Sequence, residues 1–89
     1  MKRRLSELPV GAKGVVAAVG GERSVRRRLM ELGLVPGTPI AVVNVAPLGD
    51  PLELQVRGSR LSLRRVETAN VELTDAIELP PRRKLTVVA

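Results

Sequence analysis

Residues 24–37, SVRRRLMELGLVPG, carry the most decisive signals for the fold of this 89-residue chain. Apolar residues recur at helical spacing in the first half of this stretch, whereas the three consecutive arginines lean away from them. Ser24 is a typical N-cap residue, so the pattern predicts a helix that begins there. The helix face that we expect to pack on a core consists of Val25, Leu29 and Leu32.

Two stop signals follow this helix. Gly33 can adopt the left-handed conformation that ends a helix, and a Schellman motif would then pack Leu34 back onto Leu29. Pro36 and Gly37 suit the second and third positions of a type II turn. We therefore expect the chain to leave the helix and enter a strand directly.

The segments on either side of the helix predict short strands. Before it, residues 5–8 predict one helical turn, and residues 15–19 predict a strand that two glycines close. After it, apolar and polar residues alternate with a period of two, as in strands with one buried face. The strands predicted in this second part are residues 40–45, 52–56, 61–63 and 71–73, with a single 3₁₀ turn at residues 66–70.

Five short strands in so small a chain protect their edges best by curling into a barrel. The predicted fold is therefore mainly β, a small five-stranded barrel of SH3-like or OB-like type with one short helix inserted between the first two strands. From Thr74 onward the alternation ends, and Pro80-Pro81 cannot join a central strand. We expect one domain over residues 1–79 and a basic tail over residues 80–89.

The net charge of +6 is located at the two ends of the chain. Residues 5–79 carry nine basic and nine acidic residues, so the predicted barrel is neutral. Each basic residue near an anionic bilayer contributes about 1 kcal/mol of attraction. The ends therefore predict a weak contact with an anionic membrane surface, with solubilising tails as the alternative. The surplus cations are Lys2, Arg3, Arg4, Arg82, Arg83 and Lys84.

The sequence contains no Cys, His, Trp, Tyr or Phe, and this composition excludes most catalytic chemistry. Thiolate and imidazole ligands for zinc, copper or haem iron are lacking, and a nucleophile–base pair would need Ser with Lys or a carboxylate. We predict no enzyme activity, no cofactor and no metal site. Sequence-specific nucleic-acid binding is not expected either, because no aromatic ring can stack on bases. The GxxG sequence at residues 11–14 enters a strand and therefore predicts a turn.

No stretch of the sequence is typical of export or of a membrane helix. The basic start is followed by LSELPVGAKG rather than by an apolar run. The longest apolar stretches, residues 15–19 and 40–43, are far shorter than the roughly 20 residues that a spanning helix needs. We therefore expect a cytoplasmic protein, peripheral at the inner membrane if the basic ends touch the bilayer.

Three blocks in this order resemble the FeoA family, the small cytoplasmic partner of bacterial ferrous iron transport. They are RLMELGLVPG at residues 28–37, Gly49-Asp50-Pro51 and Leu63-Arg64, within a resemblance that covers about residues 5–73. The resemblance implies an SH3-like barrel with one inserted helix, which agrees with the fold predicted from periodicity. It also implies a non-catalytic accessory protein that associates with the membrane transporter FeoB and modulates it.

The residues expected to bind this partner lie on and just after the helix, and they are Arg26, Arg27, Met30, Leu34 and Val35. Met30 lies at the edge of the apolar stripe, where an exposed thioether would form an interaction surface. The alternatives are a methionine that fills a core gap and a solvated helix face, with Arg27 four residues before Glu31. The alternative function is nonspecific nucleic-acid binding by the basic ends and the three arginines, which predicts a steep salt dependence.

Overall fold

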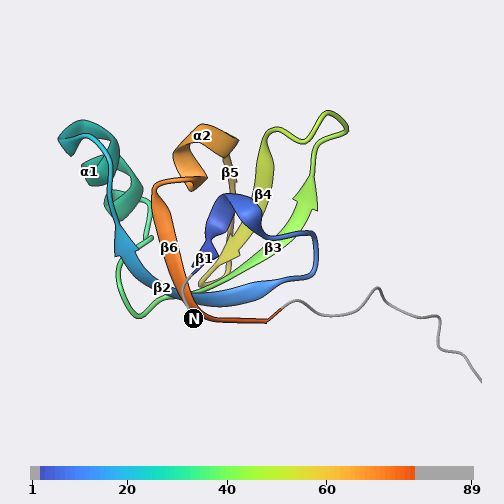
Figure 1. The fold of residues 1–89 in the computed structure, drawn as a ribbon, viewed down its shortest axis with the longest axis horizontal. Helices are drawn as coiled ribbons and strands as arrows, with labels where there is room; N and C mark the ends of the chain where they lie inside the picture. The colour runs from blue at the N-terminus through green and yellow to red at the C-terminus, as the bar shows by residue number, and fades with distance from the viewer. Residues whose placement is uncertain (1–2, 78–89) are drawn as a thin grey trace, which may run out of the picture.

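The computed structural model describes residues 3–77 of the chain (Figure 1). Strands dominate this part, as the sequence predicted. The elements in chain order are β1 (Arg3–Arg4), η1 (Leu5–Glu7), β2 (Lys13–Val19), α1 (Arg23–Glu31), β3 (Pro39–Val45), β4 (Leu52–Val56), β5 (Ser59–Leu63), α2 (Arg65–Thr68) and β6 (Val71–Ile77). The predicted tail, residues 80–89, lies outside the described residues, so the boundary at residue 79 stays a prediction.

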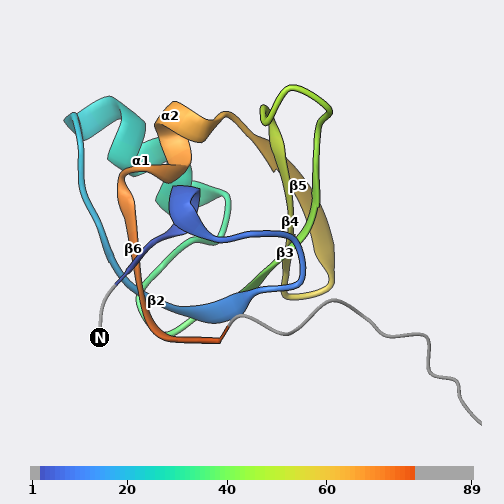
Figure 2. The ribbon, with the colours of Figure 1, turned by 45° about the vertical axis from the view of Figure 1, so that its right-hand side comes forward.

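The strands form one antiparallel sheet with the order β1-β6-β2-β3-β4-β5, which curls around η1 (Figures 1 and 2). The prediction of five strands is wrong by one. The additional strand is β1, in which Arg3 and Arg4 pair with Leu73 and Glu72 of β6. Two successive arginines show no alternation, so periodicity could not reveal a strand that exists only through its partner.

A second helix stands where the sequence predicted a 3₁₀ turn. Residues 65–68 form the single turn of α2, and the amide of Ala69 donates to the carbonyl of Arg65 at 3.0 Å. The Glu67 carboxylate supports this turn because it accepts the backbone N–H of Arg64, its N-cap residue, at 3.0 Å. The sequence RRVE therefore contains a helix start signal.

The core lies inside the curled sheet and consists of aliphatic side chains. In β4 the side chains alternate between buried and half-buried positions, as the period of two predicted. Both fully buried threonines have hydrogen-bond partners, since Thr68 donates to the Arg65 carbonyl at 2.9 Å and Thr38 accepts from Arg57 at 3.3 Å. The buried apolar residues are Leu5, Leu8, Ala12, Val16, Leu29, Leu34, Ile40, Val42, Leu52, Leu54, Val56, Leu63, Val71 and Leu73.

The end of α1 has the predicted geometry. Gly33 adopts a φ of 105°, and the Leu34 amide donates to the Leu29 carbonyl at 3.1 Å, as a Schellman motif requires. The next four residues form a turn in which Gly37 has a φ of 94° and the Thr38 amide donates to the Val35 carbonyl at 3.1 Å. This hydrogen bond and the positive φ at the third position are those of the predicted type II turn.

The start and the packing face of α1 differ from the prediction. The helix begins at Arg23 with Glu22 as its N-cap, so Ser24 is not the cap residue. Of the predicted apolar face, Leu29 is fully buried and Val25 is partly buried, but Leu32 is 38% exposed. The reversal at Gly33 brings Leu34 into the core, and Leu32 is thereby left at the surface.

The last strand, β6, continues to Ile77, four residues beyond its predicted end at residue 73. Two of its residues, Asp75 and Ala76, lie opposite Gly14 of β2, and Asp75 has a φ of 55° at this irregularity. A Cβ atom on Gly14 would lie 3.2 Å from both the Ala76 Cα and the Thr74 carbonyl oxygen. The absence of a side chain at Gly14 therefore permits the bulge that lets β6 continue.

Substitution of Gly14 by Ala should destabilise the fold through this close approach. The new Cβ meets backbone atoms of β6, which yield less easily than a side chain, and we expect a loss of about 1–3 kcal/mol in the free energy of unfolding. Gly20→Ala is the matched control, because its Cβ would meet only the Asn70 carbonyl at 3.9 Å. Urea denaturation should show the control within about 0.5 kcal/mol of the parent. Equal effects of the two changes would contradict the close approach.

Candidate functional site

The helix α1 stands at one end of the sheet beside α2 (Figures 1 and 2). Leu29 is its only fully buried residue, and Val25 is half-buried. The outer side of the helix is therefore exposed, and the partner-binding role of this segment stays a prediction.

Three of the five predicted partner-binding residues line one shallow hollow. Arg26, Arg27 and Met30 line a hollow of about 490 Å³ on the outer side of α1, together with Arg23 and Glu31. Met30 is 37% exposed, so it lies at the surface rather than filling a core gap. Arg27 forms the expected ion pair with Glu31 at 3.4 Å, but both side chains are exposed, and such pairs contribute little to stability.

The other two predicted residues do not share this surface. Leu34 is fully buried, so its assignment as a partner-binding residue is wrong. The Schellman motif folds it back onto the core, where it cannot reach a partner without unfolding the helix end. Val35 is half-buried in the following turn.

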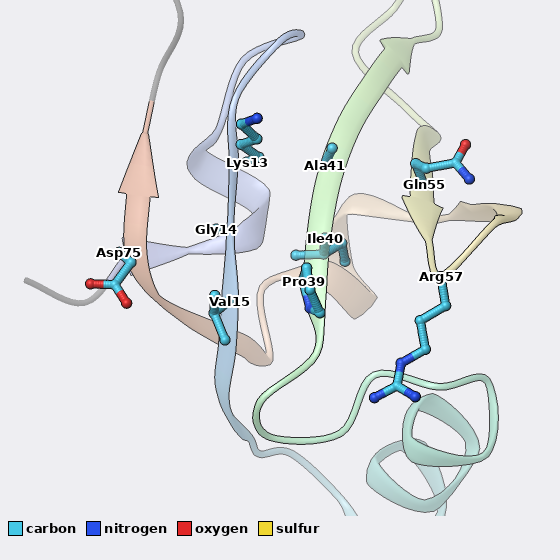
Figure 3. Close-up of a pocket in the computed structure, with 9 residues that line it drawn as sticks. All are labelled: Lys13, Gly14, Val15, Pro39, Ile40, Ala41, Gln55, Arg57 and Asp75. Atoms are coloured by element: carbon cyan, nitrogen blue, oxygen red, sulfur yellow. The ribbon is translucent and has the colours of Figure 1, made fainter.

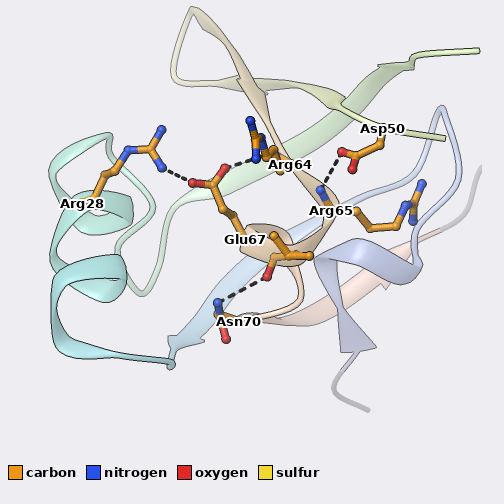
Figure 4. A network of polar contacts seen from close by, with 7 residues as sticks. Arg28, Asp50, Arg64, Arg65, Glu67 and Asn70 are labelled. Carbon is orange, nitrogen blue, oxygen red and sulfur yellow. Dashed lines mark hydrogen bonds and ion pairs between the residues drawn. The ribbon is translucent and has the colours of Figure 1, made fainter. Parts of the chain in front are cut away.

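Arg28 points away from this hollow toward α2, where it forms an ion pair with Glu67 (Figure 4). Sequence analysis missed this link between the two helices. Glu67 accepts from the Arg64 backbone with its second carboxylate oxygen. The backbone N–H of Arg64 and then the Arg28 guanidinium lower the pKa of the Glu67 carboxyl, against the raising effect of its partial burial.

A second cluster of contacts surrounds Arg65, the first residue of α2. Its backbone N–H donates to the Asp50 carboxylate at 2.8 Å (Figure 4). Its guanidinium donates to the Gly49 carbonyl at 2.9 Å and to the Ser6 carbonyl. One side chain therefore joins the β3–β4 loop, η1 and α2. Two of these residues belong to the block at residues 49–51 that the sequence singled out.

A further hollow of about 420 Å³ is lined by residues of β2, β3, β4 and β6 (Figure 3). Its lining includes Val15, Pro39 and Ala41, with the charged side chains of Lys13, Arg57 and Asp75 also at its wall. Within residues 3–77, no three acidic side chains gather in a way that would hold a metal ion. The predicted lack of a metal site stays a prediction.

A known family matches most of the chain. The model of the FeoA domain matches residues 3–75. A fusion of Fe(2+) transport protein A with the Fe(2+) transporter FeoB from Porphyromonas gingivalis is 41% identical over 70 residues. These residues are 79% of this chain but only 8% of the fusion protein, so the chain spans a small fraction of the length of that relative.

Solved structures with this fold include two from the same family. FeoA of Stenotrophomonas maltophilia, described as an SH3 domain protein complexed with zinc, is 34% identical with a TM-score of 0.75, over 85% of this chain and 96% of that one. FeoA of Chlorobium tepidum is 40% identical with a TM-score of 0.73, over 92% and 75% of the two chains. The predicted SH3-like type of the fold is thereby confirmed. A manganese-dependent transcriptional repressor, 15% identical with a TM-score of 0.76 over 82% of this chain and 36% of its own, shares the fold alone.

The lowered pKa of Glu67 predicts how stability depends on pH. Because the folded-state pKa lies below the unfolded one, the ionised carboxylate stabilises the fold at neutral pH, and this contribution disappears as the pH falls through the folded-state value. Glu67→Gln should therefore unfold at lower denaturant than the parent at pH 7. The difference should shrink below about pH 4, where a glutamate becomes protonated.

The control for this experiment is Glu31→Gln, which removes the exposed ion pair with Arg27. Its effect should be small at every pH. A Glu67→Gln variant with the same offset from the parent at pH 3 and pH 7 would show that the carboxylate charge does not stabilise the link between the helices.

Proposed function

The chain belongs to the FeoA family, and from this membership we propose that it is an accessory protein of ferrous iron uptake that binds the membrane transporter FeoB and modulates it. The observation that carries the proposal is the Porphyromonas gingivalis relative, in which a domain 41% identical to this chain is part of the same polypeptide as FeoB. A domain held in one chain with a transporter works at high effective concentration beside it. A separate chain of the same family would reach the same place by binding.

We propose that the outer side of α1 makes the contact. Arg26 and Arg27 offer planar guanidinium groups that bind carboxylates through two hydrogen bonds, and Met30 offers a flexible apolar side chain in the same hollow. The helix is held by its buried Leu29 and by the ion pair from Arg28 to Glu67. The surface is therefore presented by a fixed element, which lowers the entropic cost of binding.

In this proposal the protein acts without catalysis. A domain that binds one conformation of the cytoplasmic part of the transporter more tightly than another shifts the population toward the bound conformation. The largest shift, reached when the transporter is saturated with the domain, is set by the ratio of the two affinities. A small binding domain can thus change the rate of iron passage without forming part of the pore.

The proposed location is the cytoplasm, with a weak electrostatic contact to the inner membrane. Among residues 3–77, neither helix combines the length and hydrophobicity that crossing a bilayer requires. The basic ends are not both tails, because Arg3 and Arg4 belong to β1 of the sheet. Lys2 and the cluster at residues 82–84 lie outside the described residues.

Replacement of Arg26 and Arg27 by Ser should weaken binding to the cytoplasmic domain of the FeoB-type transporter from the same organism. We expect a loss of about tenfold in affinity by calorimetric titration, since charged anchors near an interface centre contribute on this scale. Met30→Ser should also weaken binding. Arg60→Ser, on the far strand β5, is the control and should bind like the parent.

The same titrations test the alternative function. One outcome is that the parent does not bind the transporter domain but binds random-sequence DNA with an affinity that falls steeply with salt. The protein is then a nonspecific nucleic-acid binder, and our proposal is wrong. If it binds the transporter domain and the Arg26 and Arg27 variant binds equally well, α1 is not the contact surface.

The membrane contact has its own test. Changing Lys2, Arg82, Arg83 and Lys84 to Ser removes four cations and leaves Arg3 and Arg4 in the sheet. Because each cation contributes about 1 kcal/mol near an anionic bilayer, cosedimentation with phosphatidylglycerol-containing vesicles at low salt should be lost, while the melting temperature is unchanged. Vesicles of phosphatidylcholine alone are the control. A parent that does not cosediment would remove this part of the proposal.

A further inference from the structure

Leu48, at the tip of the loop between β3 and β4, is the most exposed large apolar residue of the described chain, with 96% of its surface in contact with solvent. A solvated leucine is common at a loop that moves freely, where it carries no information. The β3–β4 loop is different, because hydrogen bonds hold its backbone on both sides of Leu48.

These hydrogen bonds come from the loop itself and from α2. Within the loop, the Gly49 amide donates to the Ala46 carbonyl at 2.7 Å, and the Ala46 amide donates to the Pro51 carbonyl at 3.0 Å. From α2, Arg65 donates to the Gly49 carbonyl at 2.9 Å and to the Asp50 carboxylate at 2.8 Å. Ala46 and Gly49, one on each side of Leu48, thus have hydrogen-bond partners, and the leucine projects from a rigid support.

The loop lies at the same end of the sheet as both helices (Figures 1 and 2). A hollow of about 480 Å³ connects them, with walls from Arg28 of α1, Pro51 of the loop and Val66 of α2. Four of the five exposed large apolar residues in the described chain belong to the helices, to the C-cap of α1 or to the loop at this end. They are Met30, Leu32, Leu48 and Val66.

The charge of this end indicates what kind of molecule would meet it. The two helices, their caps and the loop carry six arginines and four carboxylates, an excess of two positive charges. Ion pairs bind Arg27 to Glu31 and Arg28 to Glu67. A partner surface with an acidic rim complements this excess.

We infer that Leu48 is an anchor residue that inserts into an apolar socket with an acidic rim on the transporter's cytoplasmic domain, so that the docking surface extends from α1 across α2 to the β3–β4 loop. This inference rests on the function proposed above and adds the residue that gives the contact its specificity. A pre-positioned anchor binds without paying for loop ordering. One rigid leucine, in a chain without any aromatic residue, suits a protein socket better than a bilayer, where a broad apolar face is needed.

The test is the affinity of the FeoB-type cytoplasmic domain for the parent and for Leu48→Ser. Since Leu48 makes no contribution to the core, the variant should melt like the parent, and its affinity should fall by about tenfold. Val10→Ser is the matched control, because Val10 is also exposed, at 51%, but lies in the turn between η1 and β2. Its affinity should stay within about twofold of the parent.

A second pair of variants tests the rigid support. Asp50→Ala removes the acceptor for the Arg65 amide, whereas Asp50→Asn retains an oxygen there. Asp50→Ala should weaken binding more than Asp50→Asn, although both keep Leu48. Equal affinities of the two would show that anchoring does not depend on the loop being held.

The outcomes separate this inference from the proposed function. If the parent binds the transporter domain and Leu48→Ser binds within about twofold of it, the anchor is refuted while the proposed function stands. If the parent does not bind, both are refuted. If Leu48→Ser instead loses binding only to phosphatidylglycerol-containing vesicles, the leucine inserts into lipid and the protein socket is refuted.

Discussion

The hydrogen bond from the Leu34 amide to the Leu29 carbonyl determines which residues at the end of α1 are buried and which are exposed. It forms because Gly33 adopts a φ that other residues rarely accept, and it turns the chain back at the end of α1. Leu34 then enters the core beside Leu29, and both are fully buried. The outer side of α1 faces solvent, so Arg26, Arg27 and Met30 become available for binding.

Contacts to the short helix α2 join the features at this end of the sheet. Glu67 binds Arg28 of α1, and Arg65 binds the β3–β4 loop and η1. Neither link needs a large apolar interface, which so small a domain lacks. The proposed docking surface is therefore stabilised by hydrogen bonds with charged donors or acceptors, which are stronger than those between neutral groups.

The family comparison gives these contacts a biological setting. In one relative a FeoA domain is fused to FeoB, and this supports our proposal that the chain acts beside such a transporter. A repressor at 15% identity shares the fold, and a shared fold does not by itself imply a shared function. Function must therefore be sought in surface residues such as Arg26, Met30 and Leu48.

The sequence by itself determined the local features: the end of α1 at Gly33, the type II turn at Pro36-Gly37, and the alternation in β4. Each depends on the conformational preferences of a few adjacent residues, and these preferences can be read directly from the residue types. Only the tertiary structure decided that β1 exists, that β6 continues past Gly14, that Leu34 is buried and Leu32 exposed, and that Arg28 reaches Glu67. These features depend on contacts between segments far apart in the chain. The conformation or burial of a residue is then set by the segment that it packs against, which local sequence does not reveal.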